Sequence, residues 1–409
     1  VARANRWGEP RDSVAPYPPI AHVLYVIKEN RTYDEVLGDL PAGDGDSTLV
    51  FFPRAVTPNQ HALAERFGIY DRFFVNAEVS ADGHNWTTAA YATDYVQRSL
   101  PPWYSGRGRT YDYEGTNRGE DADHVPDDDV AAPANGYLWD LAERAGISFR
   151  NYGEFVVRRG KGDSARYIGT KPFLARTTSP RFAGFDLAIP DQRRADAWLA
   201  EFADDVRAGR MPTLEIVYLP NDHTAGTDPG ACTPAACVAD NDLALGRIVE
   251  ALSRSPFWRS TAVFVVEDDA QNGPDHVDSH RAPFLVISPW ARPGVQHRWT
   301  NTTDVVATIA ELLHLGHLSQ FDYYGRPLRD AFGDSANLAP YTAARPAVDL
   351  TARNPARGVG SAESRRLDLS REDRVDDEQF NRLLWRAIKG RQPYPGPTRA
   401  SALEWRRSR

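Results

Sequence analysis

Acidic and histidine side chains gather in one short stretch of the sequence. "VEDDAQNGPDHVDSHR", residues 266–281, holds five carboxylates and two histidines directly after an apolar run. Hard divalent cations such as calcium prefer oxygen ligands, and neutral imidazole suits zinc and manganese. Alone, the stretch is also typical of a solvated turn, so its meaning depends on which residues lie beside it.

Two more polar clusters follow apolar runs elsewhere in the chain. "KENRTYD" begins at Lys28 after "HVLYVI", and "PNDHTAGT" begins at Pro220 after "TLEIVYL". Together, the three clusters predict two groups of metal ligands. The first is rich in oxygen and comprises Glu29, Asn30, Asp268 and Asp269. The second mixes nitrogen and oxygen and comprises Asp222, His223, His276 and His280.

A fourth segment offers a nucleophile. "VSADGHNW", residues 79–86, predicts the end of an apolar strand, a turn containing glycine, and a helix that starts near His84 or Asn85. The turn holds Ser80 and Asp82. The first N–H groups of a helix are free and its N-terminal end is positive, which suits a phosphate group. Serine and aspartate are also ordinary helix caps, so a purely structural role for both residues stays open.

The elements that must position these residues form a regular series. Four continuous apolar segments, at 22–27, 213–219, 261–266 and 284–288, predict buried strands of a parallel sheet. Helical patterns lie between them, for example at 239–255 and 302–316. This alternation predicts a doubly wound α/β fold with a mostly parallel central sheet and helices on both faces. In such folds the ligand site lies at the carboxyl ends of the strands, where the polar clusters fall.

We expect two parts along the chain. Residues 1–335 form the predicted catalytic domain, and residues 336–409 form a C-terminal extension docked on it, which ends in the amphipathic helix "DEQFNRLLWRAIKG". The stretch 97–195 is rich in Arg, Gly, Tyr and Asp and weakly periodic. We interpret it as a long insertion that could cover the site.

Composition limits the partners. A formal charge of −8 over 409 residues argues against nucleic acid as the main partner. No run approaches the roughly 20 apolar residues that span a bilayer, so we expect no stable membrane insertion. The oligomeric state stays open.

The two cysteines indicate the kind of cellular compartment in which the protein folds. Cys232 and Cys237 are the only ones in the chain. Their proximity favours a local disulfide over two unpaired thiols, and a disulfide indicates an oxidising compartment. We therefore expect a secreted or periplasmic protein whose leader lies outside the sequence given.

Taken together, "VIKENRTYDEVLG", "PNDHTAG" and "VVEDDAQNGPDHVDSHR" resemble the motifs of the bacterial phosphoesterase family. That family includes acid phosphatases and phospholipases C and lies within the alkaline phosphatase superfamily. The resemblance spans residues 20–330 and implies an alkaline phosphatase-like fold. It also implies that the oxygen-rich group holds a divalent metal, and that the mixed group binds a second metal or the phosphate.

The nucleophile departs from the family pattern. In phospholipase-like members a threonine or serine stands three positions before an asparagine at the helix start, whereas here that position holds Asp82. Two schemes stay open: Ser80 attacks phosphorus, or Asp82 is a metal ligand and a metal-bound hydroxide attacks.

The predicted function is a metal-dependent phosphoester hydrolase, either a phosphomonoesterase or a phosphodiesterase of phospholipase C type. It would use one or two ions of calcium, zinc or manganese and act on a small-molecule or lipid phosphoester. The helix start at His84 would steady the developing charge and His280 would protonate the leaving alcohol. Further substrate contacts are predicted for Lys28, Arg31 and Asn85. The alternatives are a non-catalytic extracellular calcium-binding module and a phosphoryl-transfer relative on the same fold.

Overall fold

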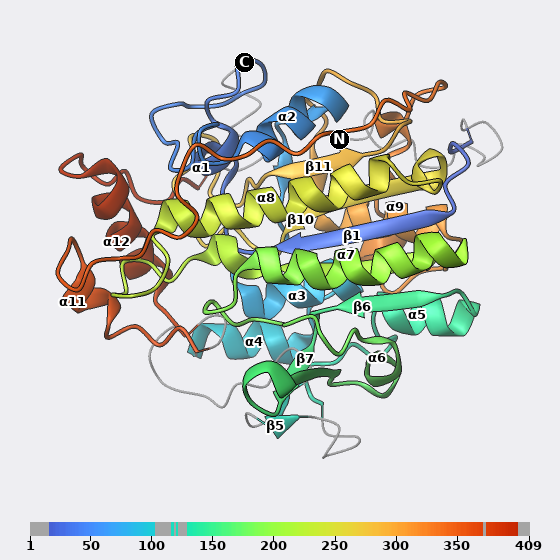
Figure 1. Ribbon diagram of the computed structural model, residues 1–409, viewed down its shortest axis with the longest axis horizontal. Coiled ribbons are helices and arrows are strands. Elements are labelled where there is room, and N and C mark those ends of the chain that lie inside the picture. The colour runs from blue at the N-terminus through green and yellow to red at the C-terminus, as the bar shows by residue number, and fades with distance from the viewer. Residues whose placement is uncertain (1–15, 103–115, 118–119, 122–128, 371–373, 400–409) are drawn as a thin grey trace.

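A five-stranded sheet forms the centre of the computed structural model, which describes residues 16–102, 116–117, 120–121, 129–370 and 374–399 (Figure 1). The strand order is β11-β10-β1-β9-β6. The strands are β1 (His22–Lys28), β6 (Phe149–Tyr152), β9 (Leu214–Leu219), β10 (Thr261–Glu267) and β11 (Phe284–Ile287). All run parallel except β11, which pairs antiparallel with β10. The predicted fold class, a mostly parallel sheet between helices, is confirmed.

Helices cover both faces of this sheet. Leu24 and Val26 of β1 pack in one core with α2 (Pro58–Phe67), α7 (Asp191–Ala208) and α8 (Pro234–Ser253). Val23 and Tyr25 face the opposite way, into a second core with α5 (Leu138–Ala145) and α9 (Thr302–Leu312). Because successive side chains of a strand point to opposite faces, a strand buried on both sides is apolar throughout. This explains the continuous apolar runs in the sequence.

The remaining elements are short or peripheral. The helices are α1 (Tyr33–Leu37), α3 (Ser80–Ala89), α4 (Asp94–Pro102), α6 (Pro172–Thr177), α10 (Gln320–Tyr323), α11 (Ser361–Ser364) and α12 (Asp377–Lys389). The strands are β2 (Ile69–Tyr70), β3 (Phe73–Phe74), β4 (Thr116–Asn117), β5 (Glu120–Asp121), β7 (Val156–Arg159), β8 (Arg166–Gly169), β12 (Val295–Gln296) and β13 (Thr300–Asn301). Single 3-10 turns are η4 (Gly162–Ser164), η5 (Pro220–His223), η6 (Trp258–Ser260) and η7 (Arg329–Ala331).

Two details of the predicted sheet were wrong. The strand at 284–287 is antiparallel, because the loop from β10 to β11 contains no crossover helix and a parallel return needs one.

The fifth strand, β6, was not predicted and comes from within the proposed insertion 97–195. Its sequence "FRNY" is short and half polar, which hides it from periodicity. The stretch 97–195 therefore supplies part of the central sheet. A covering role for 103–115, 118–119 and 122–128 lies outside the described residues.

The C-terminal part packs on the same body. Phe380, Leu383, Leu384 and Trp385 of α12 are buried in the core that α7 and α8 share.

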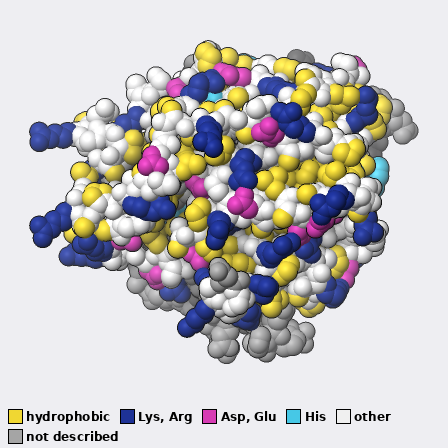
Figure 2. Space-filling view, viewed as in Figure 1, with side chains coloured by type: hydrophobic (Ala, Val, Ile, Leu, Met, Phe, Trp, Pro, Cys, Tyr) yellow, Lys and Arg dark blue, Asp and Glu magenta, His cyan; other side chains and the backbone are white. Residues whose placement is uncertain are grey.

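The predicted disulfide between Cys232 and Cys237 is confirmed, with 5.6 Å between the two Cα atoms. On the face shown in Figure 2, Lys and Arg side chains are spread among acidic and hydrophobic ones. None of the helices in the described ranges is long and apolar enough to cross a bilayer.

Candidate metal and catalytic centre

The strand register brings the predicted polar clusters to one edge. Lys28, the last residue of β1, pairs with Glu267 of β10 and with Leu219 of β9. The chain therefore leaves all three strands at the same level. The residues that follow, Glu29, Asp268 and the turn η5, emerge side by side, as the sequence pattern predicted.

Five oxygen-bearing side chains converge there, and we call them the oxygen cluster: Glu29, Asn30, Ser80, Asp268 and Asp269. The Ser80 Oγ atom lies 3.2 Å from Glu29 Oε2, 3.0 Å from Asn30 Oδ1 and 3.0 Å from Asp269 Oδ2. A hydroxyl carries one proton, so it can donate to only one of these three acceptors. When Asn30 Oδ1 faces Ser80, the other contacts bring oxygen atoms together without a hydrogen between them, and a cation would relieve this repulsion.

The Asn30 amide can take two orientations. In one, Oδ1 joins the other oxygen atoms around Ser80. In the other, Nδ2 lies within donating distance of Glu29 Oε2 at 2.6 Å, Ser80 Oγ at 3.0 Å and Asp268 Oδ1 at 3.1 Å. The second orientation satisfies the acids when no cation is present, and the first presents an additional oxygen ligand to a cation.

The cluster is buried and strongly acidic. Glu29, Asp268 and Asp269 are all fully buried carboxylates. Burial raises the pKa of the Asp268 carboxyl to about 6, although the nearby His84 and Ser80 oppose the shift. One Asp268 oxygen, Oδ2, has no hydrogen-bond partner. Several buried oxygen atoms of this kind fit a hard divalent cation such as calcium, whereas zinc in proteins is mostly held by nitrogen and sulfur.

Helix α3 starts at Ser80, and the prediction of a start near His84 or Asn85 was wrong. The reason is Asp82, which caps the helix from its third position: its Oδ1 accepts from the Val79 N–H at 3.1 Å. Its other oxygen accepts from the Gln97 side-chain amide at 3.3 Å. Ser80 thus occupies the first turn of α3, beside the cluster. Asp82 is turned toward the start of its own helix.

A glycine lets this first turn come close to β10. A Cβ atom at Gly83 would lie 2.8 Å from the Asp268 carbonyl oxygen, closer than real Cβ contacts. Asn30 adopts a left-handed backbone conformation, with φ 66°, at the point where the chain leaves β1. Such conformations are costly outside glycine and recur at functional sites. Both features hold the cluster in a fixed geometry.

His84 reaches the cluster from the next turn of α3. Its Nε2 atom lies 3.2 Å from Glu29 Oε1, and its Nδ1 atom lies 2.9 Å from Glu154 Oε1. Glu154 is fully buried, and the sequence analysis missed it. It lies after β6 in the weakly periodic region. The only sequence signal would have been that a buried histidine needs a partner.

Asp222 and His223 hold the strand ends together. Asp222 Oδ2 pairs with Lys28 Nζ at 2.6 Å, and its Oδ1 accepts from the Glu29 N–H at 3.1 Å. The His223 Nδ1 atom lies 2.9 Å from the Thr224 carbonyl oxygen, and the ring contacts Phe185. Burial lowers the pKa of His223 to about 4, so this imidazole is neutral.

His276 and His280 lie in two other environments. His276 Nδ1 is 2.6 Å from Asp34 Oδ2, in a group with Asp275. His280 Nδ1 is 2.7 Å from Asp278 Oδ1, and its Nε2 is 3.1 Å from Glu78 Oε1. Within the described ranges the predicted mixed group therefore does not assemble as one site. The loop after β10 is long enough to carry each histidine to its own carboxylate.

The predicted substrate-binding side chains point to internal partners. Besides Asp222, Lys28 pairs with Glu267 at 2.8 Å. Arg31 donates to the carbonyl oxygens of Asp222 and His223, at 2.9 and 2.8 Å. Asn85 donates to the Ala81 carbonyl at 3.3 Å, within its own helix. All three are buried, so their contacts position the strand ends and α3.

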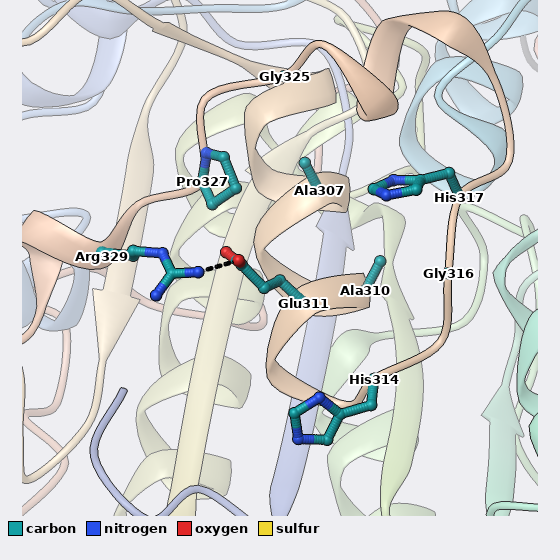
Figure 3. Close-up of a pocket in the computed structure, with 9 residues that line it drawn as sticks. All are labelled: Ala307, Ala310, Glu311, His314, Gly316, His317, Gly325, Pro327 and Arg329. Carbon is teal, nitrogen blue, oxygen red and sulfur yellow. Dashed lines mark hydrogen bonds and ion pairs between the residues drawn. The ribbon is translucent and has the colours of Figure 1, made fainter. Parts of the chain in front are cut away.

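A separate hollow of about 390 Å³ lies along α9 (Figure 3). The ion pair between Arg329 and Glu311 spans one side of it, and His314 and His317 lie on the other. Its lining contains no residue of the oxygen cluster.

Comparison with known families decides which group of proteins this architecture belongs to. The model of the Phosphoesterase family matches residues 43–316, which is two thirds of the chain. The chain belongs to the Phosphoesterase family. The predicted phosphoesterase family is thereby confirmed, and the matched residues include the second and third motifs. No curated protein matches the chain significantly.

Several solved structures resemble this phosphoesterase family member at low identity. A superfamily protein from Vibrio parahaemolyticus is 16% identical with a TM-score of 0.49, and the match covers 76% of this chain and 70% of that one. The phosphonate monoester hydrolase of Agrobacterium radiobacter is 13% identical with a TM-score of 0.45, covering 78% of each chain. The murine ectonucleotide pyrophosphatase/phosphodiesterase 5 is 12% identical with a TM-score of 0.45, covering 76% of this chain and 100% of that one.

Proposed function

We propose that this protein is a metal-dependent phosphoester hydrolase in which Ser80 attacks phosphorus. The observation that carries the proposal is the position of the Ser80 Oγ atom, 3.0–3.2 Å from three oxygen atoms of the cluster. The other four members, Glu29, Asn30, Asp268 and Asp269, would hold one divalent cation. These four oxygen donors favour calcium or manganese over zinc, and the His84 nitrogen lies close enough to Glu29 and Asp268 to add a further donor. When bound, the cation neutralises phosphate oxygens and lowers the pKa of the attacking hydroxyl.

The chain's own residues account for the first transfer step. Ser80 lies at the N-terminus of α3, where the positive end of the helix dipole would stabilise negative charge on the phosphate. The Ser80 proton passes to a neighbouring carboxylate, Asp269 or Glu29. The Oγ–P bond forms as the bond from phosphorus to the leaving oxygen breaks. Water then hydrolyses the phosphoserine and restores the hydroxyl.

His280 is proposed to protonate the leaving alcohol. Burial lowers its pKa, but hydrogen bonds to Asp278 and Glu78 outweigh this and raise the pKa to about 9. The imidazole is therefore protonated at neutral pH and holds a proton for the leaving group. Glu78, which contacts His280 Nε2 at 3.1 Å, lies two residues before Ser80 in the sequence, and this link supports His280 as the donor. His84, held between Glu154 and Glu29, positions the Glu29 carboxylate.

The proposal also covers the class of substrate and the cellular compartment of the protein. We take the substrate to be a small-molecule or lipid phosphoester. The Cys232–Cys237 disulfide supports an oxidising compartment, which in most organisms lies outside the cytosol. A secreted or periplasmic site of action follows from that reasoning, and fractionation of the producing cells tests it.

The nucleophile is tested with two substitutions and a control. Ser80→Ala should lower kcat on mono- and bis-(4-nitrophenyl) phosphate by about a thousandfold or more, because the covalent step is lost. Asp82→Asn should keep most activity, since Asp82 caps its helix and lies outside the oxygen cluster. Ser288→Ala removes another buried serine hydroxyl, bonded to the Thr261 carbonyl, and serves as the matched control.

The opposite pattern would assign a different mechanism. Full activity in Ser80→Ala combined with loss in Asp82→Asn would support hydroxide attack and exclude the serine.

Mass spectrometry of acid-quenched enzyme adds a direct readout. A phosphate on the peptide that contains Ser80 is expected in the wild type and absent in Ser80→Ala.

A further inference from the structure

A second cavity lies away from the oxygen cluster, beside the N-terminal ends of α7 and α8. Its volume is about 610 Å³, and its lining includes Asn221 of η5, Asp240 of α8 and the segment 350–353. Asn221 and Asp240 are buried, whereas Arg193 and Arg353 in the same lining are exposed. The lining thus combines a buried acidic end with two exposed arginines and the half-buried Asp228, and Leu187 and Leu350 add apolar surface.

The Asn221 side chain is the feature that indicates a ligand. Its Nδ2 atom donates to Asp240 Oδ2 at 2.8 Å, which fixes the orientation of the amide. Its Oδ1 atom has no hydrogen-bond partner, although the residue is only 3% exposed. A buried carbonyl oxygen without a donor is costly, because it has lost water and gained nothing in return. A ligand that donates a hydrogen bond at this end of the cavity would satisfy it.

The charge around Asp240 is also incomplete. Its Oδ2 atom accepts from two neutral donors, the Asn221 amide and the Asp191 N–H. The adjacent buried acid, Asp191, pairs with Arg194 at 3.0 Å. No salt bridge to Asp240 occurs in the described part of the chain. Two buried acids therefore share one nearby arginine, and a positive group in the cavity would supply the missing charge.

We propose that this cavity binds a small organic molecule with a protonated amine at one end and an acidic group at the other. The amine would donate to Asn221 Oδ1 and Asp240, and the acidic group would face Arg193 and Arg353. The volume lies within the roughly 300–1,000 Å³ typical of small-molecule sites. Opposite charges at the two ends select a zwitterion over a simple amine or a simple acid. The site is independent of the proposed hydrolysis.

Isothermal titration of the full chain with three probes of similar length tests the proposal. The probes are 4-aminobutyrate, butylamine and butyrate. 4-Aminobutyrate should bind tightest, butylamine about tenfold weaker, and butyrate weakest, because only the first satisfies both ends. Arg193→Ala and Arg353→Ala should each weaken 4-aminobutyrate binding, and the double variant should reduce it to the level of butylamine while leaving butylamine binding unchanged. Arg210→Ala, another exposed arginine at the far end of α7, should change neither.

Two further variants probe the inner end. Asn221→Leu should weaken both amines about tenfold, and Ala188→Trp should block the cavity from an exposed lining position without altering the acids. Folding of each variant is checked by its thermal unfolding midpoint. The proposal is overturned if butyrate binds as well as 4-aminobutyrate. It is equally overturned if no probe binds at millimolar concentration, or if folded Asn221→Leu and Ala188→Trp both bind like the wild type. Turnover of a phosphoester is not needed for any of these readouts, so the outcome is separate from that of Ser80→Ala.

Discussion

Two acidic groups at the same edge of the sheet are built in opposite ways. The oxygen cluster takes Asp268 and Asp269 from the start of the loop after β10, and the second group takes Asp275 from the same loop and Asp34 from α1. In the second group Arg281 donates to Asp275 at 3.0 Å and to Asp34 at 3.0 Å. We call this second group the arginine-paired group.

The difference between the two lies in where the positive charge comes from. Arg281 is fully buried, its guanidinium packs 4.5 Å from the centre of the Tyr33 ring, and it neutralises its acids from within. The oxygen cluster contains three carboxylates and a hydroxyl that cannot serve all its acceptors. Counting acids in the sequence does not separate the two cases. The presence or absence of a buried arginine within the group does, and this difference supports our proposal that the oxygen cluster, beside His84, is the metal site.

The largest expected effect is on catalysis. Asp268→Asn and Asp269→Asn should each lower kcat/KM for a 4-nitrophenyl phosphate ester by about a thousandfold or more, because each removes a charged metal ligand beside Ser80. Asp275→Asn should leave kcat/KM within about tenfold of the wild type in the folded fraction. Equal losses in all three variants would erase the proposed distinction between the groups.

For the free energy of unfolding, the arginine-paired group should be more sensitive to substitution than the oxygen cluster. Arg281→Met should destabilise the protein by about 3–5 kcal/mol, because it leaves Asp34 and Asp275 buried without a cation. In EDTA, Asp268→Asn should instead unfold at higher urea than the wild type, since it relieves repulsion within the cluster. Arg210→Met, at an exposed position, is the control. A metal-free Asp268→Asn protein less stable than the wild type would show that the cluster is balanced without a metal.

The pH dependence of stability tests whether the buried Asp268 carboxylate destabilises the metal-free protein. Burial raises the pKa of Asp268 to about 6 in the folded chain, above its usual value of 3.8. The folded state therefore holds this proton more tightly than the unfolded state, and the resulting stability is lost as pH rises from about 4 through 6. In EDTA, the stability advantage of Asp268→Asn over the wild type should grow across this window. Urea unfolding at pH 4, 5, 6 and 7 measures it, and an advantage that does not change with pH would contradict the assignment.

The smallest effect is expected at Glu154. Glu154→Gln should lower kcat about tenfold, because the imidazole of His84 loses the carboxylate that orients it. Metal content should stay unchanged, and the pH profile of kcat should shift, which a general loss of stability would not produce. Glu143→Gln, at an exposed residue paired with Arg176, is the matched control. An unaltered pH profile would remove Glu154 from the positioning of the site.

The sequence predicted that Glu29, Asn30, Asp268 and Asp269 would lie together because the ends of buried strands can be recognised in it. Continuous apolar runs ended just before Glu29 and Asp268, and parallel strands bring their carboxyl ends together. The start of α3 was misplaced because Asp82 was taken as part of a turn, whereas its carboxylate caps the helix from within. Periodicity does not report such a contact.

Long-range partners were the part that could not be predicted. Five carboxylates lie in the sixteen-residue stretch that contains His276 and His280, but their spacing does not predict that His276 contacts Asp34 or that His280 contacts Glu78. Glu154 reaches His84 only because β6 joins the sheet beside β9. Each of these contacts depends on how distant loops pack.

The central claim is that the oxygen cluster, and not the arginine-paired group, holds the metal. Equilibrium dialysis of EDTA-treated protein against calcium or manganese, followed by elemental analysis, tests it most directly. The account predicts one divalent ion per chain in the wild type and in Asp275→Asn, and loss of that ion in Asp268→Asn. Retention of the ion in Asp268→Asn together with its loss in Asp275→Asn would contradict it.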